Sequence, residues 1–87
     1  MYRIVYQEHV IHKHIPKIPK NFQILIKKAI ENKLVCDPIS FGAPLRHSMH
    51  GHRKIRIGDY RVVYRIENTQ VIIIAIMHRK EVYKHKK

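Results

Sequence analysis

Apolar and polar residues alternate most regularly over residues 54–65, where the sequence reads KIRIGDYRVVYR. The alternation is interrupted by Gly58 and Asp59, a pair typical of a two-residue turn, so this segment predicts a β-hairpin. In that register Ile57 lies opposite Tyr60. One face of the hairpin then carries its apolar side chains, which we expect to point into a core: Ile55, Ile57, Tyr60, Val62 and Tyr64.

The N-terminal half predicts one strand and two helices. Alternation over residues 2–6 predicts the strand, and residues 8–15 a short helix that is ended by the prolines at 16 and 19. Asn21 is the expected N-cap of a second helix that reaches about Lys33. The apolar stripe of this helix is predicted to be Phe22, Leu25, Ile26, Ala29 and Ile30.

The C-terminal half predicts three strands, after a long loop over residues 38–51. The strands are expected at about 52–57, 60–67 and 71–78, with Asn68 near a second tight turn. The last strand is apolar on both faces, which predicts a central strand covered on each side. The chain is therefore predicted to be a single α+β domain (1–87), with an N-terminal strand and two helices packed on one face of a small, mainly antiparallel four-stranded sheet in the order β-α-α-β-β-β.

The charge balance points to a polyanionic partner. Eighteen Lys and Arg residues against six Asp and Glu give a formal charge of +12. Nucleic acid is the first partner class to expect, and an acidic protein is the second. The single cysteine, Cys36, excludes an internal disulfide and is typical of a reducing compartment. No apolar run approaches the roughly 20 residues of a membrane span, so we expect a cytoplasmic protein without a membrane partner.

The polar face of the hairpin carries the strongest candidate site. Arg56 is predicted to lie opposite Arg61, with Lys54 one step along, although like charges in that position cost a few tenths to about 1 kcal/mol. We interpret the three cations as a site for an anion. The alternative, an ordinary solvated strand face, is stronger for Arg65, which we include as a substrate-binding candidate.

A second candidate segment follows the last strand. Arg79 and Tyr83 are four residues apart, so one helical turn would place both on the same side; the alternative is a polar chain end with a packed tyrosine. The remaining substrate-binding or proton-carrying candidates are His50, His52 and His78. No set of residues has recognised metal-ligand spacing, so neither a metal nor a cofactor is expected.

The order of these segments resembles the RelE/ParE toxin superfamily of type II toxin–antitoxin systems. The resemblance covers the whole chain and is most specific in RIGDYRVVY and HRKEVY. In that superfamily the RelE branch cleaves messenger RNA in the ribosomal A site, whereas the ParE branch poisons DNA gyrase. RelE-type enzymes use a basic set whose positions match Lys54, Arg56, Arg61, Arg79 and Tyr83, and this favours the RelE branch.

The resemblance implies a metal-independent endoribonuclease, in which a ribose 2′-hydroxyl attacks the adjacent phosphate. Arg56 and Arg61 would hold the phosphate and Arg79 the leaving oxygen. Lys54 is the base candidate because nearby like charges favour its neutral form, and Tyr83 would stack on or orient a base. The implied partners are a cognate antitoxin protein and mRNA on the ribosome. A ParE-like gyrase inhibitor, a basic RNA-binding module without catalysis and an inactive toxin that still binds its antitoxin remain the alternatives.

Overall fold

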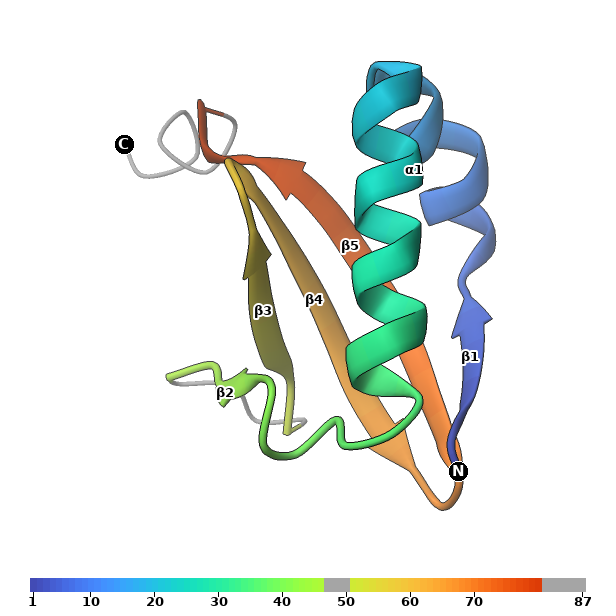
Figure 1. Cartoon of the computed structure of the whole chain (residues 1–87), viewed down its shortest axis with the longest axis vertical. Coiled ribbons are helices and arrows are strands. Elements are labelled where there is room, and N and C mark those ends of the chain that lie inside the picture. Colours follow the sequence, from blue (N-terminus) through green and yellow to red (C-terminus); the bar gives the residue numbers. More distant parts are fainter. Residues whose placement is uncertain (47–50, 81–87) are drawn as a thin grey trace.

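The computed structural model describes residues 1–46 and 51–80, and its centre is a five-stranded sheet with the strand order β1-β5-β4-β3-β2 (Figure 1). The interior strand β5 pairs in parallel with β1 and antiparallel with β4, and the remaining neighbours are antiparallel. The predicted α+β class is confirmed, with one strand more than expected. The strands are β1 (Arg3–Tyr6), β2 (Ala43–Pro44), β3 (Arg53–Ile57), β4 (Tyr60–Glu67) and β5 (Gln70–His78).

The helical segments follow β1, as predicted, but they are less regular than expected. A π-helical turn and a 3-10 turn precede the main helix, which ends in a second π-helical turn. In chain order these are η1 (Val10–His14), η2 (Ile15–Lys17), α1 (Lys20–Ala29) and η3 (Ile30–Leu34).

The predicted cap at Asn21 is wrong. The helix α1 begins at Lys20, directly after Pro19 and two residues earlier than a cap at Asn21 would place it, and no side chain caps it. The carbonyl of Pro19 instead accepts hydrogen bonds from the backbone N–H groups of Phe22 (2.9 Å) and Gln23 (3.0 Å). With a ψ of 145°, Pro19 is itself outside the helix, as an N-cap residue is, while its carbonyl accepts the first helical hydrogen bonds.

The buried stripe of α1 and η3 runs along Ile26, Ile30 and Leu34, which are at most 3% exposed. Their spacing of four residues places them on one helix face. Phe22 and Leu25, which were predicted to belong to this stripe, are 40% and 50% exposed. They lie on the flank of α1, so the apolar surface of the helix is wider than the surface that the sheet covers.

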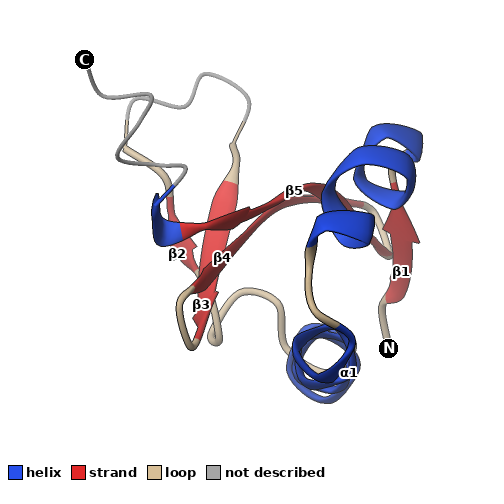
Figure 2. Ribbon diagram, turned by 90° about the horizontal axis from the view of Figure 1, so that it is seen from above, coloured by secondary structure: helices blue, strands red, loops and turns tan. Residues whose placement is uncertain are grey.

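The helix α1 lies on one face of the sheet, as its end-on view in Figure 2 shows. All five hairpin side chains predicted to point inward are at most 9% exposed, from Ile55 to Tyr64. On the other face, no helix of the described ranges packs on the β3–β4 hairpin. The expectation that β5 is covered on both sides is correct only for its first half: Ile72 and Ile73 are at most 8% exposed, whereas Ala75 and Met77, beyond Ile73, are half-buried.

The predicted hairpin register is confirmed. Gly58 has a φ of 59°, which only glycine adopts at little cost, and Ile57 pairs with Tyr60 as expected. The second tight turn contains Asn68, with a φ of 54°. Both turns therefore set the alignment of the strands that they connect.

The pairing of β4 with β5 contains a β-bulge. Val63 pairs with Ala75 but Tyr64 pairs with Ile73, which leaves Ile74 as an extra residue in β5. Before the bulge, every second residue of β5 faces the core. The extra residue shifts this alternation by one position, so Ile76 is the next residue of the strand that is buried in the core. None of the helices in the described part of the chain is both long and apolar enough to cross a membrane.

Candidate functional site

The cations of the hairpin gather on the sheet face that α1 leaves uncovered. Their side chains alternate along β3 and β4 with the buried apolar residues and therefore point to the opposite side. We call this set the basic face: Lys54, Arg56, Arg61 and Arg65.

Arg56 and Arg61 are direct cross-strand partners, as the sequence predicted. The backbone carbonyl of His52 points away from β4, since it accepts a hydrogen bond from the N–H of Leu45 (2.9 Å). Even-numbered residues of β3 therefore turn their backbone groups outward, and Arg56 and Arg61 form a non-hydrogen-bonded pair. Such pairs have Cα atoms about 4.5 Å apart and the closest side chains in an antiparallel ladder.

No carboxylate of the described ranges forms an ion pair with Lys54, Arg56 or Arg61. The only acidic side chain paired on the basic face is Glu67, within the part of the chain that the structure describes; its Oε2 lies 2.7 Å from Nε of Arg65. Three closely spaced cations without a counter-ion form a site that can hold an anion with several oxygens, such as a phosphate.

Arg79 lies at the same end of the hairpin as the Arg56–Arg61 pair. Its backbone N–H donates to the carbonyl of Asp59 (2.8 Å), so the end of β5 is attached to the β3–β4 turn. Its guanidinium Nη1 lies 3.9 Å from Oδ1 of Asp59, but both side chains are more than half exposed. An ion pair of that length and exposure contributes little stability.

The histidine candidates do not gather at one place. His78 pairs with Tyr60, and the two rings are perpendicular with centroids 5.1 Å apart on the helix side of the sheet. The sheet therefore separates the ring of His78 from the basic face. His52, in contrast, lies on the basic face, whereas His50 and Tyr83 lie outside the described residues.

A shallow hollow of about 520 Å³ continues the basic face beyond the arginine pair. Sequence reasoning included two of its residues and missed the others. Glu67 could have been found, because it is two residues after Arg65 and alternate strand residues share a face. Ile74 could not, because the bulge determines its position. The lining residues are His52, Arg65, Ile66, Glu67 and Ile74.

A set of polar contacts, also missed from the sequence, anchors the loop before β2 to the hairpin. Arg53 Nη2 donates to the carbonyls of Ile39 (2.6 Å) and Gly42 (3.1 Å). The hydroxyl of Tyr64, the cross-strand partner of Arg53, donates to the carbonyl of Pro38 (2.6 Å). We call these contacts the loop anchor. They bring β2 against β3 at the position of Lys54, so they help to fix the strand that carries the site.

Two features show how tightly the loop anchor is packed. A Cβ atom on Gly42 would lie 1.7 Å from the hydroxyl oxygen of Tyr64, so only glycine fits there. Burial raises the pKa of Tyr64, and the neighbouring Arg53 opposes that shift.

No group of three or more potential metal ligands occurs in residues 1–46 and 51–80.

Comparison with known proteins identifies similar sequences and structures. Residues 8–83 match the model of the family described as ParE toxin of type II toxin-antitoxin system, parDE. The chain is 31% identical over 74 residues to the toxin RelG of Mycobacterium tuberculosis, which covers 83% of this chain and 85% of that protein. It is equally identical to the toxin RelE of that organism, over 83% of this chain and 76% of the relative.

The fold is also found in solved structures. The toxin–antitoxin complex RelBE2 of M. tuberculosis contains a chain with a TM-score of 0.81 and 28% identity, over 90% of this chain and 98% of that one. The isolated RelE toxin of E. coli has a TM-score of 0.74 at 24% identity, over 97% and 93% of the two chains, and supports the fold alone.

Proposed function

The chain belongs to the ParE toxin family of type II toxin–antitoxin systems, within the RelE/ParE superfamily, and from that premise we propose that it is a metal-independent endoribonuclease that cleaves messenger RNA in the ribosomal A site. The observation that carries the proposal is the Arg56–Arg61 pair, which places two guanidinium groups side by side on an uncovered sheet face. The arrangement is unfavourable by itself. A phosphodiester bound between the two groups would remove the repulsion.

The proposed reaction is an internal phosphoryl transfer. Lys54 accepts the proton of a ribose 2′-hydroxyl, whose oxygen then attacks the adjacent phosphorus. The bond to the 5′ oxygen of the next nucleotide breaks, and that oxygen, stabilised by Arg79, takes up a proton. The products are a 2′,3′-cyclic phosphate and a 5′-hydroxyl.

Arg56 and Arg61 would act on the transition state. The non-bridging phosphate oxygens gain negative charge as the 2′ oxygen attacks, and preorganised donors stabilise that charge more than the ground state. Tyr83 would stack on or orient a neighbouring base. Arg65 and His52 lie along the same face and would contact the flanking nucleotides, whereas His78 would need to act from the helix side of the sheet.

The proposed partner that controls this activity is a cognate antitoxin. Two structural neighbours are described as toxin–antitoxin complexes, from M. tuberculosis and Methanococcus jannaschii. A chain with a formal charge of +12 favours a partner with acidic segments.

Arginine replacement tests the proposal. We expect Arg56→Ala and Arg61→Ala each to reduce the rate of cleavage of ribosome-bound transcripts by about 10²–10³-fold, the usual cost of one lost transition-state donor. The matched control is Arg3→Ala, because Arg3 is an exposed arginine at the other edge of the sheet. Mapping of 5′ ends with and without ribosomes gives the measurement. Cleavage by both hairpin variants at the parental rate would contradict the mechanism.

Gyrase inhibition is the second candidate function, because the matching family model is that of the ParE toxins. Supercoiling by purified gyrase in the presence of the chain distinguishes the two. Inhibited supercoiling together with intact transcripts would replace the ribonuclease proposal.

A further inference from the structure

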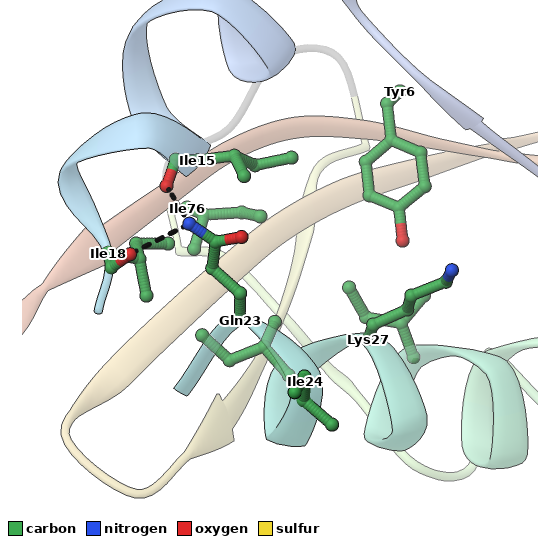
Figure 3. A pocket seen from close by; sticks show the side chains of 9 residues that line it. Tyr6, Ile15, Ile18, Gln23, Ile24, Lys27 and Ile76 are labelled. Atoms are coloured by element: carbon green, nitrogen blue, oxygen red, sulfur yellow. Dashed lines mark hydrogen bonds between the residues drawn. The ribbon is translucent and has the colours of Figure 1, made fainter. Parts of the chain in front are cut away.

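Two hollows in the described part of the chain differ in what their walls can bind. An apolar pocket lies between α1 and β5 on the helix side of the sheet, and most of its lining residues are isoleucines. The amide of Gln23 in its wall already donates to the carbonyls of Ile15 (3.0 Å) and Ile18 (2.8 Å) (Figure 3). The hollow on the basic face instead holds an arginine and a glutamate side by side. It therefore offers charged groups of both signs to a polar ligand.

The ion pair of Arg65 and Glu67 forms the polar wall of the hollow on the basic face, which we call the β4 hollow. Nε of Arg65 lies 2.7 Å from Oε2 of Glu67, and the two side chains are 32% and 51% exposed. Neither side chain forms another hydrogen bond or ion pair within residues 1–46 and 51–80. An exposed pair of this kind contributes little to stability. Substitutions at Glu67 should therefore leave the fold intact.

A carboxylate is unfavourable on a surface that binds a polyanion. Glu67 is the one acidic residue among those that line the β4 hollow, and its charge repels phosphate groups. The same carboxylate becomes favourable where it meets a ligand group that donates hydrogen bonds. Single-stranded RNA offers such donors on the Watson–Crick edges of its bases. The β4 hollow therefore suits a base better than a further phosphate.

The unused atoms of the ion pair match one base better than the others. The carboxylate of Glu67 can still accept hydrogen bonds at both oxygens, and the Nη groups of Arg65 can still donate. Guanine presents two adjacent donors, at N1 and N2, followed by the acceptor O6. Adenine and cytosine each present a single amino group beside a ring nitrogen that accepts, and uracil presents one N–H between two carbonyl oxygens. Only guanine can therefore donate twice to one carboxylate without bringing an acceptor against it.

The other walls of the β4 hollow suit a flat ring. Ile74, the extra residue of the β-bulge, is half-buried and adds an apolar surface to the hollow. His52 lines the hollow as well, and an imidazole ring can stack on a base. The volume of about 520 Å³ lies within the usual range of sites that hold a small organic group. An apolar surface and a polar wall together can hold a base and read its edge.

The position of the β4 hollow indicates which nucleotide it would contact. Arg65 follows Arg61 by four residues on β4, which corresponds to about 13 Å at 3.3 Å per residue. Both side chains lie on the basic face, because alternate strand residues share a face. A phosphate held between Arg56 and Arg61 and a base held beside Glu67 therefore belong to different nucleotides of one strand.

We propose that the β4 hollow is a base-specificity site, in which Glu67 accepts two hydrogen bonds from a guanine that flanks the cleaved phosphodiester and Arg65 donates to O6 of that base. This inference rests on the proposed function, because it takes RNA as the polymer bound on the basic face. It adds a preference for one base to a surface whose other contacts are made with phosphate.

Uridine decamers that carry one different base in the middle test the proposal. Fluorescence anisotropy gives their affinities for the parental chain. We expect the decamer with guanine to bind about fivefold or more tightly than the decamer with adenine, the usual discrimination of a good two-bond contact to a base. A decamer with inosine, which keeps N1–H and O6 but lacks the 2-amino group, should bind with an affinity between the two.

Matched glutamine variants separate base reading from charge. Glu67→Gln should reduce the ratio of the guanine and adenine affinities below about twofold, because the amide replaces one acceptor by a donor. Glu8→Gln changes the net charge by the same amount at an exposed glutamate that does not line the hollow, and should keep the parental ratio. Arg65→Lys keeps the charge but loses the Nη groups, so it should lower the ratio as well. Thermal unfolding verifies that each variant is folded.

Three results would overturn the proposal: equal binding of all decamers to the parental chain, an unchanged ratio with Glu67→Gln, or the same loss with Glu8→Gln. Each of them leaves the ribonuclease proposal standing, because transcript cleavage is measured separately. A preference for guanine that Glu67→Gln removes, together with intact transcripts, would have the opposite meaning. It would support the base-specificity site and contradict the ribonuclease.

Discussion

Tyr64 shows how much the fold depends on single side chains. It is fully buried in the core, yet its hydroxyl leaves the core to bond the carbonyl of Pro38. The same ring excludes any side chain at Gly42. One residue thus connects the apolar face of the hairpin to the loop that supports β3.

Replacing Tyr64 by Phe should lower the free energy of unfolding by about 1–2 kcal/mol at neutral pH. The change removes one hydrogen bond and leaves the carbonyl of Pro38 without that donor. Urea unfolding measures the difference. Tyr6→Phe is the control, because Tyr6 is half-buried and has no hydrogen-bond partner within the described ranges; it should change stability less.

The hydroxyl of Tyr64 also predicts a response of stability to alkaline pH. Burial raises the pKa of Tyr64 above its usual 10.0, so the folded state prefers the protonated hydroxyl. This contribution is complete below pH 10 and declines as the pH rises through 10 towards the folded pKa. The parental chain should therefore lose stability above pH 10 more steeply than Tyr64→Phe; equal slopes would contradict the assignment.

The β3–β4 hairpin is the element on which the candidate site depends. Its turn determines which residues are opposite each other, and a slip of one residue would send Arg56 and Arg61 to the core side. The attachment of Arg79 to Asp59 adds the end of β5 to the same turn. The spacing between the cations of the candidate site therefore depends on the turn as much as on the arginines themselves.

Gly58→Ala should destabilise the hairpin by about 1–2 kcal/mol, because an alanine pays that cost at a positive φ. No atom within 4 Å would contact the added Cβ, so strain alone is tested. Asn tolerates this backbone region better, and Gly58→Asn should lose less stability in the same thermal unfolding experiment. If both variants unfold like the parent, the turn does not need the φ of 59°.

Sequence reasoning succeeded for this hairpin because an alternation of two residues and a glycine turn are local signals. It failed for Phe22 and Leu25 because a helix with a wide apolar surface does not reveal which strip meets the sheet, and for Asn21 because the helix begins directly after Pro19. It missed β2 because that two-residue strand depends on the loop anchor, formed by residues distant in sequence. His78 was expected beside the cations, and the bulge in β5 placed its ring on the other side.

At the scale of the whole molecule, the two faces of the sheet have different surfaces. One face presents cations on its strands. The other face carries α1 (Figure 2), and an apolar pocket lies beside that helix. The formal charge of +12 acts on both, and the register of the hairpin brings two cations side by side where Arg56 meets Arg61. The long-range attraction of anions by the net charge and the binding of an anion at the Arg56–Arg61 pair should therefore respond separately to mutation.

Binding of a single-stranded RNA oligonucleotide should depend steeply on salt. Four phosphate contacts on the basic face would weaken binding by roughly 50-fold between 50 and 200 mM salt, since each contact adds about 0.7 to the logarithmic slope for single strands. Fluorescence anisotropy measures that slope. Arg56→Ala and Arg61→Ala together should reduce it by about 1.4, whereas Arg3→Ala should leave it nearly unchanged.

The single extra residue in β5 also changes which residues of that strand face the core and which face the opposite side of the sheet. Before Ile74 the odd-numbered residues of the strand belong to the core, and after it the even-numbered ones do. Met77 thereby comes to lie beside Arg61, on the face that carries the cations. Deletion of one residue at the bulge would turn each side chain that follows it in β5 to the opposite face of the sheet. The chain would keep all its cations, but Met77 would turn to the core in place of Ile76.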